Sequence, residues 1–178
     1  MREAELFVAA EVMLVEVLGR IREADRALVL PPIRAGDGER TLAQAVADHV
    51  RQDLQVTEVL LGAPAGAGPA PVGVGQAAGL ACAAARDPRD EGPATRDVLL
   101  RATVERSLLA HYVAARLGST ACPLPEELAR PLWELTAPDA ARWRSQGWFR
   151  EPMPLPPHVS WRDRFLLCAG HEPHPFGH

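Results

Sequence analysis

Three long stretches of the sequence repeat apolar residues at steps of three and four, and stretches rich in proline and glycine separate them. Within residues 3–30 the repeat consists of Leu6, Ala10, Met13, Val17 and Ile21. Steps of three and four place side chains on one face of a helix, because an α-helix turns once every 3.6 residues. Pro31 and Pro32 then stop the helix, since proline lacks the backbone N–H that a helix interior needs. The pattern predicts an all-α fold.

The second and third stretches predict helices over residues 41–61 and 95–117. Thr41 is a suitable N-cap, and Gly62 is a suitable residue just beyond the C-terminal end. The third helix ends before Gly118 and has apolar residues on two of its faces, which predicts deep burial. Three charged residues on it are expected to form a solvated face with local ion pairs, and they are Arg101, Glu105 and Arg106.

Two irregular stretches separate the remaining elements. Residues 62–93 are rich in Gly, Ala and Pro and predict mainly a crossover loop, with a short helix near residues 76–86. Residues 119–157 contain eight prolines and three tryptophans, which predicts packed loops and short helices. The last helix begins at Ser160 as its cap and ends near Gly170. We therefore expect one domain over residues 1–178, a four-helix bundle with long crossover loops and short extra helices.

Composition narrows the classes of function. The net charge is −4 and no basic cluster is present, which argues against nucleic-acid binding because phosphate contacts need clustered positive charge. No apolar run approaches the length of about 20 residues that spans a bilayer. The three cysteines are widely spaced and form no CxxC pair. Free thiols and an acidic N-terminal segment, unlike a signal peptide, together predict a cytoplasmic location.

The expected inward stripe of the second helix contains two polar residues, His49 and Asp53, where an ordinary core helix has apolar ones. His49 is a candidate metal ligand, because helix bundles commonly hold metal ions in their cores. Asp53 lies one helical turn later and could orient the imidazole or bind the ion itself. The alternative is a core histidine that is hydrogen-bonded to Asp53.

The C-terminal segment supplies further imidazoles at His171, His174 and His178. Their spacing of three and four would place them on one helix face, and histidines one turn apart can bind one ion. With His49 as a ligand from another helix, they would form an open site in which water takes the remaining position. The alternative is a solvated, poorly ordered terminus.

At these residues the chain resembles the DinB-like superfamily, which includes thiol-dependent S-transferases and maleylpyruvate isomerase-like proteins. Residues 41–53 resemble the second helix of that family, where a metal-binding His precedes an acid by one turn. Residues 164–174 resemble the fourth helix, where a His-x-x-His-His pattern ends the fold. The resemblance implies a divalent metal, zinc or nickel, and a low-molecular-weight thiol as co-substrate.

The resemblance also implies which residues bind the metal. His49 matches the first ligand position and His171 the second. The third ligand of the family lies four residues later, where this chain has Pro175, so His174 or His178 would take its place. The implied function is a metal-dependent thiol S-transferase or a hydrolase that acts on a small molecule.

Two other functions remain open from the sequence. One is a catalytically inert bundle whose metal site is degenerate. Such a bundle would act as a binding or assembly module and could form a homodimer. The other is a protein that binds a small ligand through the tryptophan-rich stretch.

Overall fold

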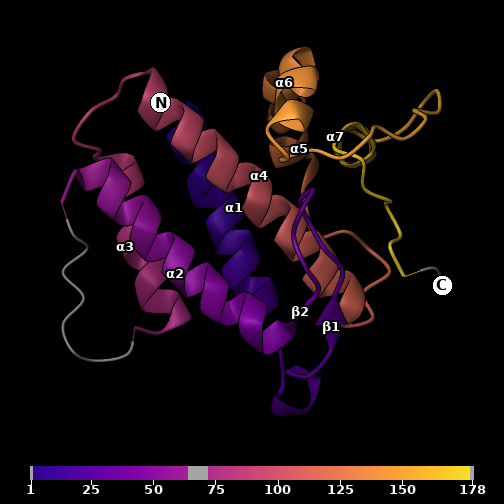
Figure 1. Ribbon diagram of the computed structural model, residues 1–178, viewed down its shortest axis with the longest axis horizontal. Coiled ribbons are helices and arrows are strands. Elements are labelled where there is room, and N and C mark those ends of the chain that lie inside the picture. The colour runs from indigo at the N-terminus through magenta and orange to yellow at the C-terminus, as the bar shows by residue number, and fades with distance from the viewer. Residues whose placement is uncertain (1, 64–71, 177–178) are drawn as a thin grey trace.

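The computed structural model describes residues 2–63 and 72–176, and most of these residues are helical (Figure 1). The helices and strands are α1 (Arg2–Leu18), β1 (Val29–Leu30), β2 (Arg40–Thr41), α2 (Leu42–Leu61), α3 (Val74–Arg86), α4 (Pro93–Arg116), α5 (Glu126–Thr136), α6 (Ala140–Ser145) and α7 (Trp161–Cys168). Short 3₁₀ turns add Glu23–Asp25 and Ala137–Asp139. The all-α class predicted from the sequence is confirmed.

Helices α1 to α4 run side by side around a shared interior (Figure 1). Both α3 and α4 pack against α1 and against α2. The short helix predicted near residues 76–86 is confirmed as α3, but the sequence assigned the fourth place in the bundle to the last helix. Instead α7 packs chiefly against α5. Alanine explains the role of α3, because alanine is the best helix former and its small side chain lets neighbouring helices come close. The buried alanines of α3 are Ala77, Ala78, Ala81, Ala84 and Ala85.

The first helix is shorter than predicted, since it ends at Leu18 and not near residue 30. The carboxylate of Asp25 accepts a hydrogen bond from the backbone N–H of Arg22 at 3.0 Å, which stabilises a 3₁₀ turn in place of further α-helix. The chain then forms a short antiparallel ribbon in which Val29 pairs with Thr41. This ribbon returns the chain to the start of α2.

The predicted helix ends are confirmed at three positions. The hydroxyl of Thr41 accepts a hydrogen bond from the N–H of Gln44 at 3.2 Å, and Gly62 ends α2 with a φ of +63°. Ser160 caps α7 in the same way, since its hydroxyl accepts a hydrogen bond from the N–H of Asp163 at 3.0 Å. These local signals depend only on neighbouring residues, which is why the sequence could predict them.

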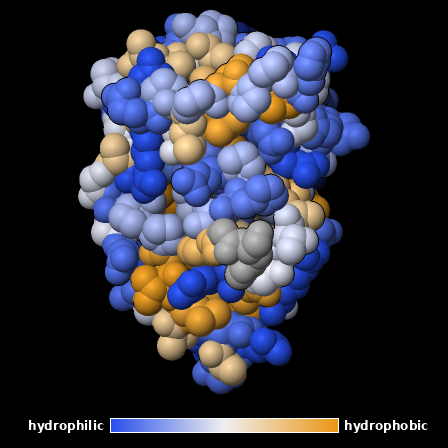
Figure 2. All heavy atoms as spheres, turned by 90° about the vertical axis from the view of Figure 1, so that its right-hand side faces the viewer, coloured by the Kyte–Doolittle hydropathy of each residue, from blue (hydrophilic) through white to orange (hydrophobic). Residues whose placement is uncertain are grey.

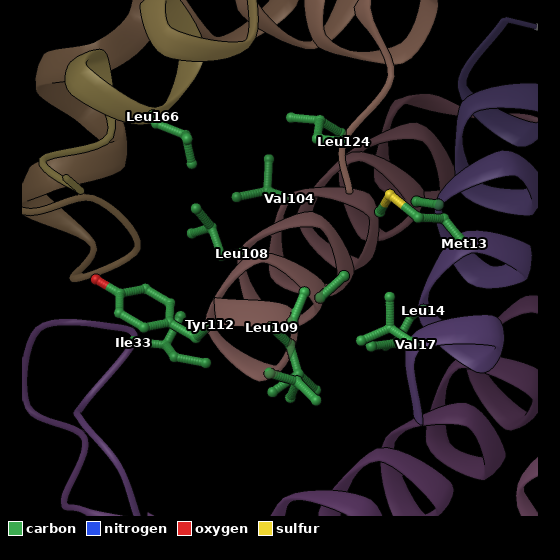
Figure 3. Close-up of a cluster of buried hydrophobic side chains, with 14 of the residues drawn as sticks. Met13, Leu14, Val17, Ile33, Val104, Leu108, Leu109, Tyr112, Leu124 and Leu166 are labelled. Atoms are coloured by element: carbon green, nitrogen blue, oxygen red, sulfur yellow. The ribbon is translucent and has the colours of Figure 1, made fainter. Parts of the chain in front are cut away.

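The main core lies between α1 and α4, and loop and α7 residues cover it (Figure 3). Among its members are Met13, Leu14 and Val17 of α1, Val104, Leu108 and Leu109 of α4, and Ile33, Leu124 and Leu166. Residues 102–114 of α4 are all buried, which confirms the predicted burial of this helix. The predicted solvated face is wrong for Glu105 and Arg106, because both are buried.

The surface beside β1, β2 and α7 mixes polar and apolar side chains. Figure 2 shows apolar side chains gathered in two regions with a band of polar ones between them. Over the described ranges, none of the helices has the length and apolar character that crossing a membrane requires.

Candidate functional site

Four titratable or charged side chains meet inside the group formed by α1, α2, α3 and α4. Glu11 comes from α1, His49 and Asp53 from α2, and Arg106 from α4, and none of them exposes more than 1% of its surface. Glu11 faces inward because it lies four residues after the buried Phe7. We call these four residues the buried charged cluster.

The imidazole of His49 lies between two carboxylates. Its Nε2 is 2.9 Å from Glu11 Oε1 and 3.3 Å from Asp53 Oδ2. Arg106 contacts the other oxygen of each carboxylate, since its Nε donates to Glu11 Oε2 and its Nη2 donates to Asp53 Oδ1. Each carboxylate therefore directs one oxygen to the guanidinium and the other to the imidazole.

Two further contacts fix the guanidinium of Arg106. Its Nη1 donates a hydrogen bond to the carbonyl of Ala102 at 3.1 Å. Its central carbon lies 4.6 Å from the centre of the Phe7 ring, an arrangement that favours a cation. Contacts with Ala102 of α4 and with Phe7 of α1 therefore both hold the guanidinium in place.

The two carboxyl groups differ in acidity. Burial raises the pKa of Asp53 to about 6, although the charges of Arg106 and His49 act in the opposite direction. Burial acts the same way on Glu11, but the hydrogen bond from His49 and the charge of Arg106 outweigh it, so the pKa of Glu11 lies below its ordinary value. Glu11 is thus the permanent anion of the cluster, and Asp53 is the carboxyl group that takes up a proton most easily.

Three members of the buried charged cluster fit a metal ion. One donor atom each from Glu11, His49 and Asp53 lies within 4.8 Å of the other two. The separations of 2.9 and 3.3 Å from His49 Nε2 are close to the distance of roughly 3.3 Å between neighbouring ligands of a tetrahedral zinc ion with bonds of about 2.0–2.1 Å. Asp53 Oδ2 makes no hydrogen bond within the described parts of the chain. An imidazole and two carboxylates could hold a divalent cation.

Two of the site residues predicted from the sequence, His49 and Asp53, lie close together in the structure. Glu11, which the sequence did not predict, lies beside them. It places His171 in other surroundings: His171 Nδ1 lies 2.9 Å from the hydroxyl of Tyr112, and the ring is buried. Burial, with the charge of Arg150 nearby, lowers the pKa of His171 to about 3. The ring is therefore neutral at ordinary pH.

The two other predicted tail ligands also lie apart from the cluster. His174 is exposed and lines a cavity of about 130 Å³ together with His111 and Cys122. His178 lies outside the described residues. Within residues 2–63 and 72–176, the set of metal-capable side chains that converges on one point contains no tail histidine.

Sequence reasoning missed Glu11 and Arg106. The signal that identified His49 was present for both, because each is a charged residue in an otherwise apolar stripe of its helix. Glu11 lies between Phe7 and Leu14, and Arg106 lies between Ala102 and Leu109. A charge among inward-facing residues at helical spacing is the pattern that connects all members of the cluster.

Comparison of the chain with models of known protein families, with characterised proteins and with solved structures finds no match.

Proposed function

We propose that this protein binds one divalent metal ion through Glu11, His49 and Asp53. The observation that supports the proposal is the convergence of three donor atoms from two helices, α1 and α2, within 4.8 Å. Arg106 has a supporting part, because it holds the outer oxygen of each carboxylate and leaves the inner oxygen for the ion. Ligating carboxylates in metal proteins are commonly hydrogen-bonded in this way.

The metal we propose is zinc or nickel. Imidazole suits both ions, and carboxylates complete the ligand sets of many zinc sites. A divalent ion held there would act as a Lewis acid, which is the chemistry that a thiol transferase or a hydrolase of the DinB-like kind needs. The similarity of residues 41–53 to the second helix of that superfamily favours such a Lewis-acid role. In this chain His49 corresponds to the metal-binding His of the family, and Asp53 to the acid one turn later.

A second candidate is a metal-free structural cluster in an inert helical protein. Two observations favour it. Arg106 already contacts both carboxylates, so a cation is present without a metal. His49 Nδ1 makes no hydrogen bond in the described part of the chain, whereas metal-binding histidines usually donate from the second ring nitrogen.

Metal content distinguishes the two candidates. The purified protein is stripped with a chelator, dialysed against zinc or nickel, and measured by elemental analysis. We expect about one ion per chain, an Asp53→Asn variant with lower affinity, and a His49→Ala variant without metal. Zinc at 100 times its Kd should also stabilise the protein by about 2.7 kcal/mol, which raises the Tm by about 5–11 °C.

His174→Ala is the matched control, because His174 is exposed and lies outside the cluster. It should bind metal as the unaltered protein does. Stoichiometric metal that is lost in His174→Ala and kept in His49→Ala would move the site to the tail. If neither ion binds to a protein with native circular dichroism, the metal proposal is wrong and the structural cluster remains.

A further inference from the structure

A cleft of about 310 Å³ lies between α2 and α4 and reaches Arg106. One wall is apolar and consists of Val56 and Val59 from α2 and Val98 from α4. Val59 exposes 61% of its surface, so this wall is open to solvent. The volume lies at the lower end of the range of about 300–1,000 Å³ that is typical of small-molecule sites.

Another part of the lining is aromatic and cationic. Trp148 lines the cleft, and two guanidinium groups lie against its indole ring. The central carbon of Arg34 is 4.9 Å from the ring centre, and that of Arg101 is 5.7 Å away. The three residues come from distant parts of the chain, namely the segment between β1 and β2, helix α4 and the segment after α6. Folding therefore assembles this part of the lining from three separate elements.

Both arginines keep donors for a ligand. Arg34 Nε is 3.4 Å from Asp37 Oδ1, and Arg101 Nη2 is 2.7 Å from Asp97 Oδ2. Neither aspartate lines the cleft, and each guanidinium has five N–H donors, of which these contacts use only some. Among the described residues that line the cleft, one is acidic, namely Glu105. Its Oε1 lies 3.7 Å from Arg34 Nη1. Arg101 is therefore the cation best placed to receive an anion.

We propose that this cleft binds a small planar organic acid. Its ring would lie along the valine wall beside Trp148, and its carboxylate would meet the guanidinium of Arg101, with Arg34 close by. Arginine suits this ligand, because its planar group both stacks on aromatic rings and binds carboxylates through paired hydrogen bonds. The proposal does not depend on a metal at Glu11, His49 and Asp53.

The test uses 2-naphthoate as the acid and 2-naphthamide as its neutral counterpart of the same shape, with binding to chelator-stripped protein measured by titration calorimetry. We expect naphthoate to bind at least about tenfold more tightly than the amide, because charge-assisted hydrogen bonds to the carboxylate are lost in the amide. Arg101→Gln and Trp148→Leu should each weaken naphthoate binding by about tenfold. Val59→Asp should weaken it as strongly, since it places a negative charge in the exposed wall.

The chain offers a matched control in a second Arg–Trp pair. The central carbon of Arg130 lies 5.2 Å from the ring centre of Trp161, and neither residue lines the cleft. Arg130→Gln should leave naphthoate binding unchanged. The proposal is overturned if the amide binds as well as the acid, if Arg130→Gln weakens binding as much as Arg101→Gln does, or if natively folded protein shows no naphthoate binding at millimolar concentration. Because the protein carries no metal in this assay, these outcomes say nothing against the proposed metal centre.

Discussion

Replacing Arg106 with methionine should destabilise the protein more than any surface charge substitution. The side chain is 1% exposed and contacts Glu11, Asp53 and the carbonyl of Ala102. Methionine fills much of the same volume but leaves two carboxylates buried without their cation. Removing one partner of a buried ion pair costs about 3–5 kcal/mol. Because a domain has roughly 5–15 kcal/mol of stability in total, the variant loses a large share of it.

Urea unfolding of metal-free protein at pH 8, followed by circular dichroism, measures this loss. A cost of 3–5 kcal/mol corresponds to a fall in Tm of about 6–20 °C for a chain of this size. The loss should be smaller at pH 5, because burial raises the pKa of Asp53 and the variant lacks the Arg106 charge that lowers it, so this carboxyl takes up a proton and leaves less buried charge. Adding Glu11→Gln to the variant should restore part of the stability for the same reason.

Arg130→Met is the control, since the Arg130 side chain is 60% exposed and its pair with Glu134 lies on the surface. It should change the free energy of unfolding by at most about 0.5 kcal/mol. A loss below about 1 kcal/mol in Arg106→Met, or a loss equal to that of Arg130→Met, would refute the reasoning that the guanidinium balances the buried carboxylates.

Three further outcomes follow from local features. His171 has a folded-state pKa of about 3 and an ordinary value of 6.5, so below pH 6.5 the unfolded chain binds a proton that the folded chain does not. His171 should therefore contribute a loss of about 2–3 kcal/mol between pH 7 and 4.5, measured by urea unfolding as the difference in pH dependence between the unaltered protein and His171→Gln; equal slopes would contradict it. Gly170→Ala should cost more than Gly36→Ala in a thermal scan: both glycines have positive φ, but a Cβ at Gly170 would lie 2.5 Å from the carbonyl oxygen of Glu151, whereas one at Gly36 would have no neighbour within 4 Å. Equal costs would show that strain in φ alone matters. Thr41→Ala should cost about 1 kcal/mol in urea unfolding because it removes the N-cap of α2, and an unchanged midpoint would show that the cap contributes nothing.

Sequence periodicity predicted the parts of the fold that depend on local patterns. It gave the class, the deep burial of α4 and the caps at Thr41 and Ser160, because each follows from residues within a turn or two. It predicted the short helix near residues 76–86 but not its packing against α1 and α2, since a run of alanine and glycine has little hydrophobic contrast between faces. It also extended α1 beyond Leu18, because the pairing of Val29 with Thr41 depends on a partner twelve residues away in the sequence.

The candidate site was half predictable for a similar reason. His49 and Asp53 lie one turn apart on one helix, so their proximity follows from spacing. Their partners Glu11 and Arg106 come from other helices, and no local rule indicates which faces meet. The predicted partnership with His171 assumed that the last helix joins the others, whereas that residue contacts Tyr112 on α4.

The ion pair between Glu11 and Arg106 joins residues that are 95 positions apart in the chain. Hydrophobic attraction is non-directional, so by itself it would oppose a slide of α4 by one turn along α1, about 5.4 Å, only weakly. The guanidinium, however, would lose both carboxylates in a place that water does not reach. Alternative alignments of the helices are thus penalised electrostatically even where hydrophobic contact would tolerate them. We therefore expect the contacts of Arg106 with Glu11 and Asp53 to favour one alignment of α1, α2 and α4.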